Sequence, residues 1–292
     1  MEYNIETTRE YYDLAWSQEQ IKTSENGEII IPAGFHWGLF EKGTKTWREA
    51  SVNMNNYVGK HLKLNHDDEM EILDAGCGMG AVCLHLADIF PNVSFTGLTL
   101  APNELVLARE LSKRLKLDNV KFFKKNYLNT EFSDNYFDGI FALESLSYAK
   151  YKNLFIDEMY RILKPGGKLI IIDGFRKDMS PKSIIYKLYM HHFKKNRGGA
   201  DIIMKEKILK QLKSKGFQIT YCRDLSMNIF KNFYILLINN TSKILKSLVS
   251  KTKNKIQVRD TKHRHNFPLI FFDCIFGLLK VCSYEIIVAE KS

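Results

Sequence analysis

The chain contains little cysteine and no closely spaced cysteine pair. Its 292 residues include five cysteines, none of them in a C-x-x-C pair. The amino terminus also lacks the basic and then apolar pattern of a secretory signal. Because disulfide-stabilised secreted domains show both features, we expect a reducing, cytoplasmic setting. No metal site is predicted.

Long hydrophobic runs are also absent. The longest apolar stretch, 267–282, is interrupted by Asp273 and Lys280 and is too short to cross a bilayer. We therefore predict no transmembrane segment. The 45% of hydrophobic residues is nevertheless enough for a buried core, in one large domain or in a domain with an insertion.

Acidic residues are scarce in one basic region. The net charge is +10, and residues 231–265 hold seven Lys and two Arg against the single acid Asp260. Nucleic acid is disfavoured as a partner because the region shows no aromatic interleaving, zinc spacing or RNA-binding signature. An anionic membrane surface and a diphosphate-bearing substrate fit equally well. The simpler alternative is that lysine-rich helices keep the chain soluble.

Three glycines at every second position follow a short apolar run. Residues 72–80 read Ile-Leu-Asp-Ala-Gly-Cys-Gly-Met-Gly, which predicts a buried strand, a tight turn and then a helix over 81–89. Glycine suits such a turn because a ligand can lie against the main chain and because positive φ costs it little. The pattern predicts a nucleotide-like cofactor, with a plain strand-to-helix turn as the alternative.

The second strand lacks the acid of a dinucleotide-binding fold. Such a fold shows G-x-G-x-x-G and a ribose-binding acid about twenty residues further on. Here the third glycine comes one residue early and Asp74 precedes the glycines. The next strand, predicted over 93–98, continues into Thr99 and Leu100 without a carboxylate. NAD is therefore the less favoured cofactor.

Strands and helices alternate after the glycine turn, which predicts an α/β fold with a parallel sheet covered on both faces. Pro165 and the two glycines after it are expected to stop a helix and to turn into the next strand. The last strand follows a gap of about sixty residues, so we predict a helical insertion there. The predicted strands span 71–75, 93–98, 120–125, 137–141, 168–173, 218–224 and 284–290, and the predicted helices span 81–89, 101–116, 153–163, 227–250 and 267–281, with a further addition at 181–199.

Several segments in fixed order resemble class I S-adenosylmethionine-dependent methyltransferases. The spacing Asp74-x-Gly76-x-Gly78-x-Gly80 resembles their first motif. Residues 98–104, Leu-Thr-Leu-Ala-Pro-Asn-Glu, resemble a segment of the branch that holds sterol, tocopherol and prenyl C-methyltransferases and cyclopropane fatty acid synthases.

This resemblance, which covers 11–225 and the last strand, implies a fold and a cofactor. The fold is a Rossmann-like seven-stranded sheet, mostly parallel with an antiparallel last strand. The cofactor is S-adenosyl-L-methionine, with S-adenosyl-L-homocysteine as product. The implied domains are an N-terminal helical lid at 1–68, a cofactor-binding core at 69–225 and 283–292, and a basic helical insertion at 226–282.

The resemblance also assigns the cofactor site. Glu104 would accept hydrogen bonds from the ribose hydroxyls, or else remain solvated and favour the helix dipole. Asn126, where the family commonly has Asp, would accept from the adenine amino group, or else serve a plain turn. The assigned residues are Tyr12, Trp37, Asp74, Gly76, Cys77, Gly78, Gly80, Thr99, Leu100, Glu104, Asn126, Tyr127 and Leu143.

The chemistry is expected after the fourth strand, where residues 142–148 read Ala-Leu-Glu-Ser-Leu-Ser-Tyr. This resembles the Glu-Ser-x-x-Tyr/His arrangement of sterol and prenyl-diphosphate C-methyltransferases. Glu144 would stabilise the carbocation formed on alkene methylation and then remove a proton; alternatively, it caps the following helix. Tyr148 and His36 are the other residues assigned to catalysis, with His36 and Trp37 lining the methyl-transfer chamber.

The leading prediction is a methyltransferase acting on a small, apolar, isoprenoid or lipid-like acceptor at carbon. Methylation of a natural-product intermediate at O or N is the nearest alternative, because one frame hosts all of these reactions. A second alternative is a non-catalytic, cofactor-binding peripheral membrane protein. RNA methylation is disfavoured because the chain has no Asn-Pro-Pro-Tyr motif and no catalytic cysteine motif.

Overall fold

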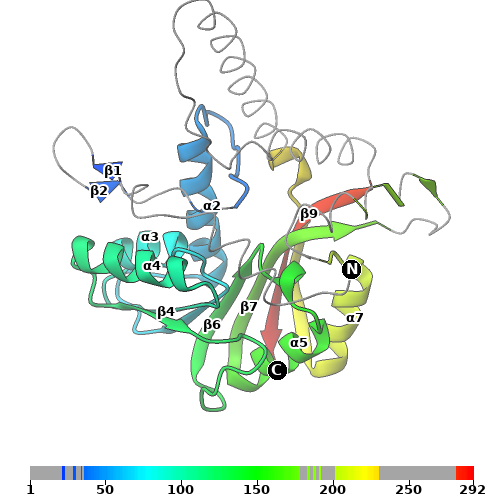
Figure 1. Cartoon of the computed structure of the whole chain (residues 1–292). Helices are drawn as coiled ribbons and strands as arrows, with labels where there is room; N and C mark the ends of the chain where they lie inside the picture. Colours follow the sequence, from blue (N-terminus) through cyan, green and yellow to red (C-terminus); the bar gives the residue numbers. More distant parts are fainter. Residues whose placement is uncertain are drawn as a thin grey trace, which may run out of the picture.

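The fold is built around one seven-stranded sheet. The computed structural model describes residues 34, 36–177, 201–229 and 281–292, with short pieces at 22–23, 29–30, 183–184, 187–188 and 191. The strands of the sheet are ordered β5-β4-β3-β6-β7-β9-β8 (Figure 1). All neighbours run parallel except β9, which is antiparallel to both β7 and β8. The predicted fold class is confirmed.

The predicted strands and helices within the described residues occur in the predicted order, and most of their bounds agree to within two residues, but the helix over 205–215 was not predicted. The strands are β1 (Lys22–Thr23), β2 (Ile29–Ile30), β3 (Glu71–Ala75), β4 (Ser94–Thr99), β5 (Val120–Lys124), β6 (Phe137–Leu143), β7 (Leu163–Arg176), β8 (Phe217–Asp224) and β9 (Cys282–Lys291). The helices are α2 (Trp47–Leu62), α3 (Ala81–Ile89), α4 (Pro102–Leu115), α5 (Lys152–Ile162) and α7 (Lys205–Lys215), with a 3-10 turn η2 (Leu146–Tyr148).

The junction between α5 and β7 corrects one prediction. The sequence predicts a separate turn around Pro165, but β7 begins at Leu163, directly after α5 ends. Residues 164–167 instead form a bulge in β7 opposite Asp138. The Lys164 ammonium donates to the Asp138 carboxylate across this bulge at 2.7 Å. The proline and glycines therefore shape a strand irregularity.

The predicted lid and insertion fall only partly within the described residues. Of 1–68, the structure describes the small β1–β2 pair, residue 34 and everything from 36 onward, including α2. Of 226–282, it describes 226–229 and 281–282. Tyr12, the basic run and the helices predicted at 227–250 and 267–281 lie outside the described residues, apart from a first turn at 226–229. Both domain assignments stay predictions.

Helices cover both faces of the sheet, α2, α3 and α4 on one and α5 and α7 on the other (Figure 1). Successive side chains of β6 alternate between the two cores: Phe141 belongs to the first cluster, whereas Ile140 and Ala142 belong to the second. A central strand buried on both faces reads as a continuous apolar run, which explains why this strand was predictable from the sequence.

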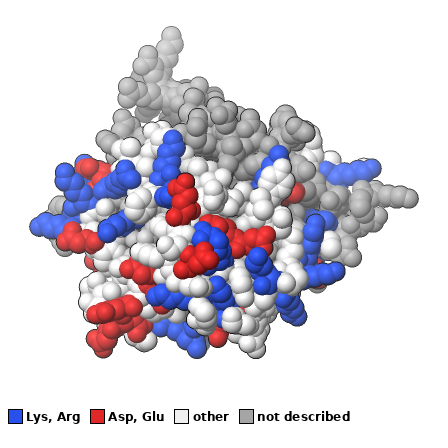
Figure 2. Space-filling view, turned by 90° about the horizontal axis from the view of Figure 1, so that it is seen from below, with Lys and Arg blue, Asp and Glu red and all other residues white. Residues whose placement is uncertain are grey.

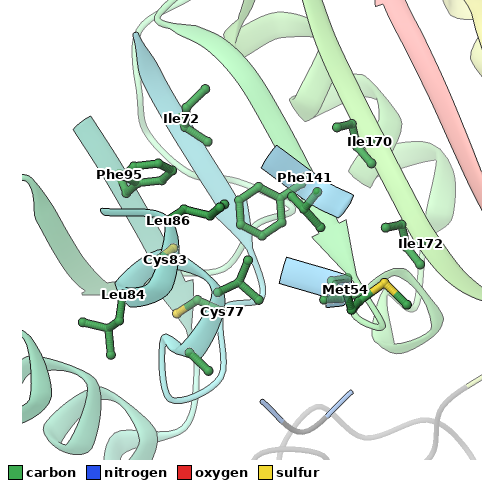
Figure 3. Packing of buried hydrophobic residues seen from close by; sticks show 14 of the residues in the cluster. Met54, Ile72, Cys77, Cys83, Leu84, Leu86, Phe95, Phe141, Ile170 and Ile172 are labelled. Carbon is green, nitrogen blue, oxygen red and sulfur yellow. The ribbon is translucent and has the colours of Figure 1, made fainter. Parts of the chain in front are cut away.

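Helix α2 closes the first face and anchors the segment before it. The helix begins with a capping box in which Thr46 Oγ1 accepts the Glu49 N–H at 3.1 Å. Its buried Met54 belongs to the same cluster as Phe141 and Ile172 (Figure 3). The Leu39 N–H donates to the Ala50 carbonyl at 2.8 Å. Helix α2 thus holds residues 36–40 over the carboxyl ends of the strands.

Charges of both signs are mixed on the face at the amino ends of the parallel strands. Figure 2 shows Lys and Arg interspersed with Asp and Glu there. Ion pairs on this side include Lys164 with Asp138 and Arg161 with Asp134. The net positive charge is therefore not gathered into a patch on this face. Within the described ranges, none of the helices has the length and apolar character to span a bilayer.

We expect Met54→Ala to destabilise the protein by about 2–5 kcal/mol, because it leaves a cavity between α2 and the sheet. Chemical denaturation followed by circular dichroism measures this loss. Val106→Ala on α4 is the control: Val106 is 52% exposed, so its substitution should change stability by about 0.5 kcal/mol or less. A Met54→Ala loss no larger than that of the control would contradict the assigned packing.

Candidate active site

A cavity lies at the carboxyl ends of β3, β4, β5 and β6. It is open on one side and large enough for a small organic ligand. Its lining comprises Gly34, His36, Asp74, Gly76, Cys77, Gly78, Met79, Ala81, Val82, Leu98, Thr99, Leu100, Ala101, Glu104, Lys125, Asn126, Tyr127, Leu128, Leu143, Glu144, Ser145 and Tyr148.

The glycine turn is shaped by positive φ and by a close approach to the next strand. Gly76 has φ of 111°, and a Cβ there would lie 2.4 Å from the Ser145 Cβ. Gly80 does not line the cavity: it is the N-cap of α3, with φ of 82°, and its Cβ would meet the Phe122 ring at 2.5 Å. Gly80 therefore has a packing role in the turn, and its assignment to cofactor contact stays a prediction.

Asp74 is a buried acid at the wall of the cavity. The side chain is only 2% exposed, and it accepts a weak hydrogen bond from the Cys83 thiol at 3.5 Å. Burial raises the pKa of Asp74 to about 8, with the Cys83 contact acting in the opposite direction. Burial likewise raises the pKa of the Cys77 thiol. Both groups are therefore mostly uncharged at neutral pH before a ligand binds.

A second carboxylate faces the cavity from the start of α4. Glu104 is 4% exposed, and its Oε2 accepts from the Thr99 hydroxyl at 2.7 Å. The alternative of a solvated Glu104 is therefore wrong. Thr99 Oγ1 also accepts the Ala101 N–H at 3.1 Å. The segment 98–104 thus places the Glu104 carboxylate at the cavity, although β4 itself ends in Thr99 without the acid of a dinucleotide-binding fold.

The segment after β5 serves a turn and also reaches the next loop. Asn126 Oδ1 accepts the Leu128 N–H at 2.9 Å, so the turn role left open by the sequence is present, while Asn126 still lines the cavity. The Tyr127 hydroxyl donates to the Ser145 carbonyl at 3.0 Å. The loop with the predicted adenine contacts is thereby tied to the turn after β6.

The predicted acid lies in the turn after β6. Glu144 has φ of 53°, and its Oε1 accepts the Trp37 N–H at 2.6 Å and the Tyr284 hydroxyl at 2.8 Å. These donors favour the ionised carboxylate. The N-cap of η2 is Ser145, whose hydroxyl donates instead to the Ala75 carbonyl at 2.5 Å. The helix-cap alternative for Glu144 is therefore not supported.

His36 and Trp37 play different parts from each other. His36 is buried, and its Nδ1 donates to the Trp37 carbonyl at 3.2 Å. Burial lowers the pKa of His36 to about 4, so the imidazole is neutral at physiological pH. The Trp37 ring packs edge-on against Trp47 and is not part of the cavity lining, and its assignment to cofactor binding stays a prediction. Its main-chain N–H reaches Glu144.

The structure thus brings together most of the assigned residues. Tyr148 and Leu143 line the same cavity as Glu144, and Tyr12 lies outside the described residues. Lining residues such as Leu98, Ala101 and Leu128 flank the predicted motifs by one position, so the motif spacing could have found them. Sequence reasoning missed Tyr284, whose only signal was its place at the start of the last predicted strand.

Residues 66–251 match the family described as a methyltransferase domain. The chain belongs to this family. S-adenosylmethionine is thereby confirmed as the cofactor class, in agreement with the motifs.

Individual relatives differ in the atom that they methylate. Sterol 24-C-methyltransferase of Debaryomyces hansenii is 24% identical over 226 residues, covering 77% of this chain and 54% of that protein. Norajmaline N-methyltransferase of Rauvolfia serpentina is 28% identical over 171 residues, covering 55% of this chain and 58% of that protein. This methyltransferase-family chain thus spans about half the length of these relatives.

Among solved structures, a cyclopropane synthase from Mycobacterium tuberculosis superposes with a TM-score of 0.78 at 16% identity. The match covers 99% of this chain and 98% of that chain. At this level of identity the likeness shows the fold alone.

The residues present fit S-adenosylmethionine. The main chain of the glycine turn borders the cavity, and a Cβ at Gly78 would fill the space 3.6 Å from Glu104 Oε1. Glu104 offers a buried carboxylate to a diol, and Leu98 and Leu100 offer apolar surface to a flat base. Asp74 stands beside the turn, where a cationic amino group would complement it.

We expect Gly76→Ala to weaken S-adenosylhomocysteine binding at least tenfold, because the added Cβ displaces Ser145 and costs about 1–2 kcal/mol at positive φ. Gly43→Ala is the matched control: Gly43 has φ of 96°, but nothing lies within 4 Å of its added Cβ. Isothermal titration calorimetry measures both affinities. Equal affinities for the two variants would contradict the proposed tight contact.

Asp74 should make the ligand-free protein less stable as pH rises from about 4 to 8. Over this window the unfolded chain releases the Asp74 proton and the folded chain keeps it, so the stability falls with pH. Relative to Asp74→Asn, the wild type should lose up to about 1.4 kcal/mol per pH unit. Urea unfolding at a series of pH values measures the difference, and a pH-independent difference would refute the assignment.

Proposed function

We propose that this chain is an S-adenosylmethionine-dependent methyltransferase that methylates a small, apolar, alkene-bearing acceptor of isoprenoid or lipid type at carbon. The observation that carries the proposal is the Glu144 carboxylate, held by the Trp37 N–H and the Tyr284 hydroxyl at the cavity wall beside the cofactor turn. Such a group suits a reaction that develops positive charge.

Each residue has a definite task in this proposal. The bound cofactor supplies an electrophilic methyl group. The glycine turn and Glu104 hold that cofactor and exclude water from one side of the reacting centre. Glu144 stabilises the cation left on the acceptor carbon after the new carbon–carbon bond forms. It then accepts a proton from the neighbouring carbon, which restores the alkene.

His36 supports the acid and does not exchange protons in this proposal. Its imidazole is neutral, and its Nδ1–H is engaged by the Trp37 carbonyl. The same residue, Trp37, presents its N–H to Glu144 at 2.6 Å. His36 is therefore a positioning residue, and Tyr148 supplies an aromatic wall to the cavity.

The choice of an apolar carbon acceptor draws on three observations. Much of the lining is apolar, including Met79, Val82, Leu128 and Leu143. The relative from Debaryomyces hansenii is named for methylation of a sterol carbon. The predicted basic segment, which would suit an anionic membrane surface or a diphosphate group, stays a prediction because it lies outside the described residues.

N-methylation is the second candidate, because the relative from Rauvolfia serpentina is named as an N-methyltransferase. The test incubates the chain with labelled S-adenosylmethionine and panels of sterols, prenyl diphosphates, unsaturated lipids, quinones and amines, and identifies products by mass. Label in a carbon–carbon bond supports the proposal. Label only on nitrogen or oxygen replaces it, and S-adenosylhomocysteine binding without any transfer favours the non-catalytic alternative.

With an accepted alkene, Glu144→Gln should lower kcat by about 10²-fold or more, because the amide neither carries the charge nor accepts the proton. The affinity for S-adenosylhomocysteine should change little. Tyr284→Phe should cause a smaller fall in kcat, since the Trp37 N–H still donates to the carboxylate. Glu110→Gln, at the surface of α4 in an ion pair with Arg114, is the control. Unchanged turnover in Glu144→Gln would remove the carboxylate from the mechanism.

A further inference from the structure

Two buried charged residues form hydrogen bonds to the turn that carries Glu144, on the side of the turn away from the cofactor cavity. Asp173 lies in β7 and is 4% exposed, and Lys152 is the first residue of α5 and is 7% exposed. Asp173 Oδ2 accepts the Ser147 N–H at 2.9 Å. Lys152 Nζ donates to the Ser147 carbonyl at 3.0 Å and to the Ala149 carbonyl at 2.6 Å.

These contacts fix both polar groups of one peptide residue. The Ser147 N–H goes to an anion and its carbonyl to a cation, and the Asp201 N–H adds a second donor to that carbonyl at 2.9 Å. The other oxygen of Asp173 accepts the Gly174 N–H at 2.7 Å. Buried polar groups usually have hydrogen-bond partners. Here two charged side chains supply the partners for main-chain groups of three residues, Ser147, Ala149 and Gly174.

Lys152 and Asp173, which together we call the bracket, carry opposite charges that compensate one another. Burial lowers the pKa of Lys152 to about 8, while Asp201 and Asp173 oppose that shift. Burial raises the pKa of Asp173, while its backbone hydrogen bonds and Lys152 oppose that shift. Removing Lys152 would leave the Asp173 charge buried without its cationic partner, whereas removing Asp173 would leave Lys152 with Asp201 alone.

The turn needs such support because its backbone is unfavourable. Glu144 has φ of 53°, a left-handed conformation that costs a non-glycine residue about 1–2 kcal/mol. On the cofactor side the turn is held through Ser145, whose hydroxyl donates to the Ala75 carbonyl and whose carbonyl accepts from Tyr127. On the opposite side it is held through Ser147.

We propose that Lys152 and Asp173 are positioning residues that set the place of the Glu144 carboxylate without contacting the cofactor or the acceptor. Neither residue lines the cavity, and both act through the main chain at 147–149. The inference rests on the proposed function of Glu144. It predicts that loosening the bracket impairs the chemical step more than cofactor binding, because the glycine turn makes its contacts elsewhere.

Lys291 is a buried lysine with a structural role only, and it offers a matched control for Lys152. It is 8% exposed, and its Nζ donates to the Asn135 side chain and to the carbonyls of Tyr160 and Leu163, each at 2.7 Å. These partners lie at the opposite end of the sheet from Glu144. Lys291→Met therefore removes a buried ammonium that makes three hydrogen bonds, against two for Lys152, but far from the site.

The test compares Lys152→Met with Lys291→Met in the full chain. We expect Lys152→Met to lower kcat by about 10- to 100-fold, as for a small misplacement of a reacting group. S-adenosylhomocysteine affinity should stay within about threefold of the wild type, because the cofactor contacts persist. Amide hydrogen exchange should rise at 144–149 and remain unchanged at 74–81. Lys291→Met should leave kcat and the exchange at 144–149 unchanged, even where it lowers the melting temperature as much.

A loss of kcat in Lys152→Met no larger than in Lys291→Met would overturn the inference, as would unchanged exchange at 144–149. If Lys152→Met fails to fold, Asp173→Asn tests the same bracket, since its amide cannot accept both the Ser147 and the Gly174 N–H. The proposed function fails separately, through absence of methyl transfer by the wild type. In that case the exchange comparison still decides whether the bracket holds the turn.

Discussion

The contact between Ser145 and the end of β3 joins the two halves of the site. Strands β3 and β6 are parallel neighbours, so their carboxyl ends emerge side by side where the strand order reverses, the place at which open α/β sheets bind ligands. The Ser145 hydroxyl donates to the Ala75 carbonyl at 2.5 Å, and Gly76 lacks the Cβ that would prevent this approach. The cofactor turn and the Glu144 turn therefore cannot be shaped independently.

Burial then determines which charges the site can carry. Asp74 lies in apolar surroundings with a thiol as its hydrogen-bond donor, so the neutral acid is favoured. Glu144 receives a main-chain N–H and a tyrosine hydroxyl on one oxygen, so the anion is favoured. Two carboxyl groups of one cavity are thereby given different electrostatic roles, one that responds to the cofactor and one that faces developing positive charge.

The sequence predicted the sheet because its central strands are buried on both faces and read as apolar runs between turn signals. It predicted the cofactor turn because alternate glycines after such a run allow positive φ and let a ligand lie against the main chain. It could not decide whether Glu104 is buried or Asn126 serves a turn, since both outcomes depend on packing between separate segments. It misplaced the start of β7, predicted at Lys168 and found at Leu163, because Pro165 and the glycines fit either a turn or a strand bulge, and register alone decides between them.

Tyr284 marks the limit of motif reasoning most clearly. It lies 140 positions from Glu144 in sequence, beyond any spacing rule, and reaches the acid only because β9 returns antiparallel against β7. The Tyr284 N–H is itself held by the Ser226 hydroxyl at 3.0 Å, so the residue that reaches the acid is also tied to the chain just after β8. The contact to Glu144 therefore depends on the antiparallel pairing of β9 with β7, which no local pattern in the sequence encodes.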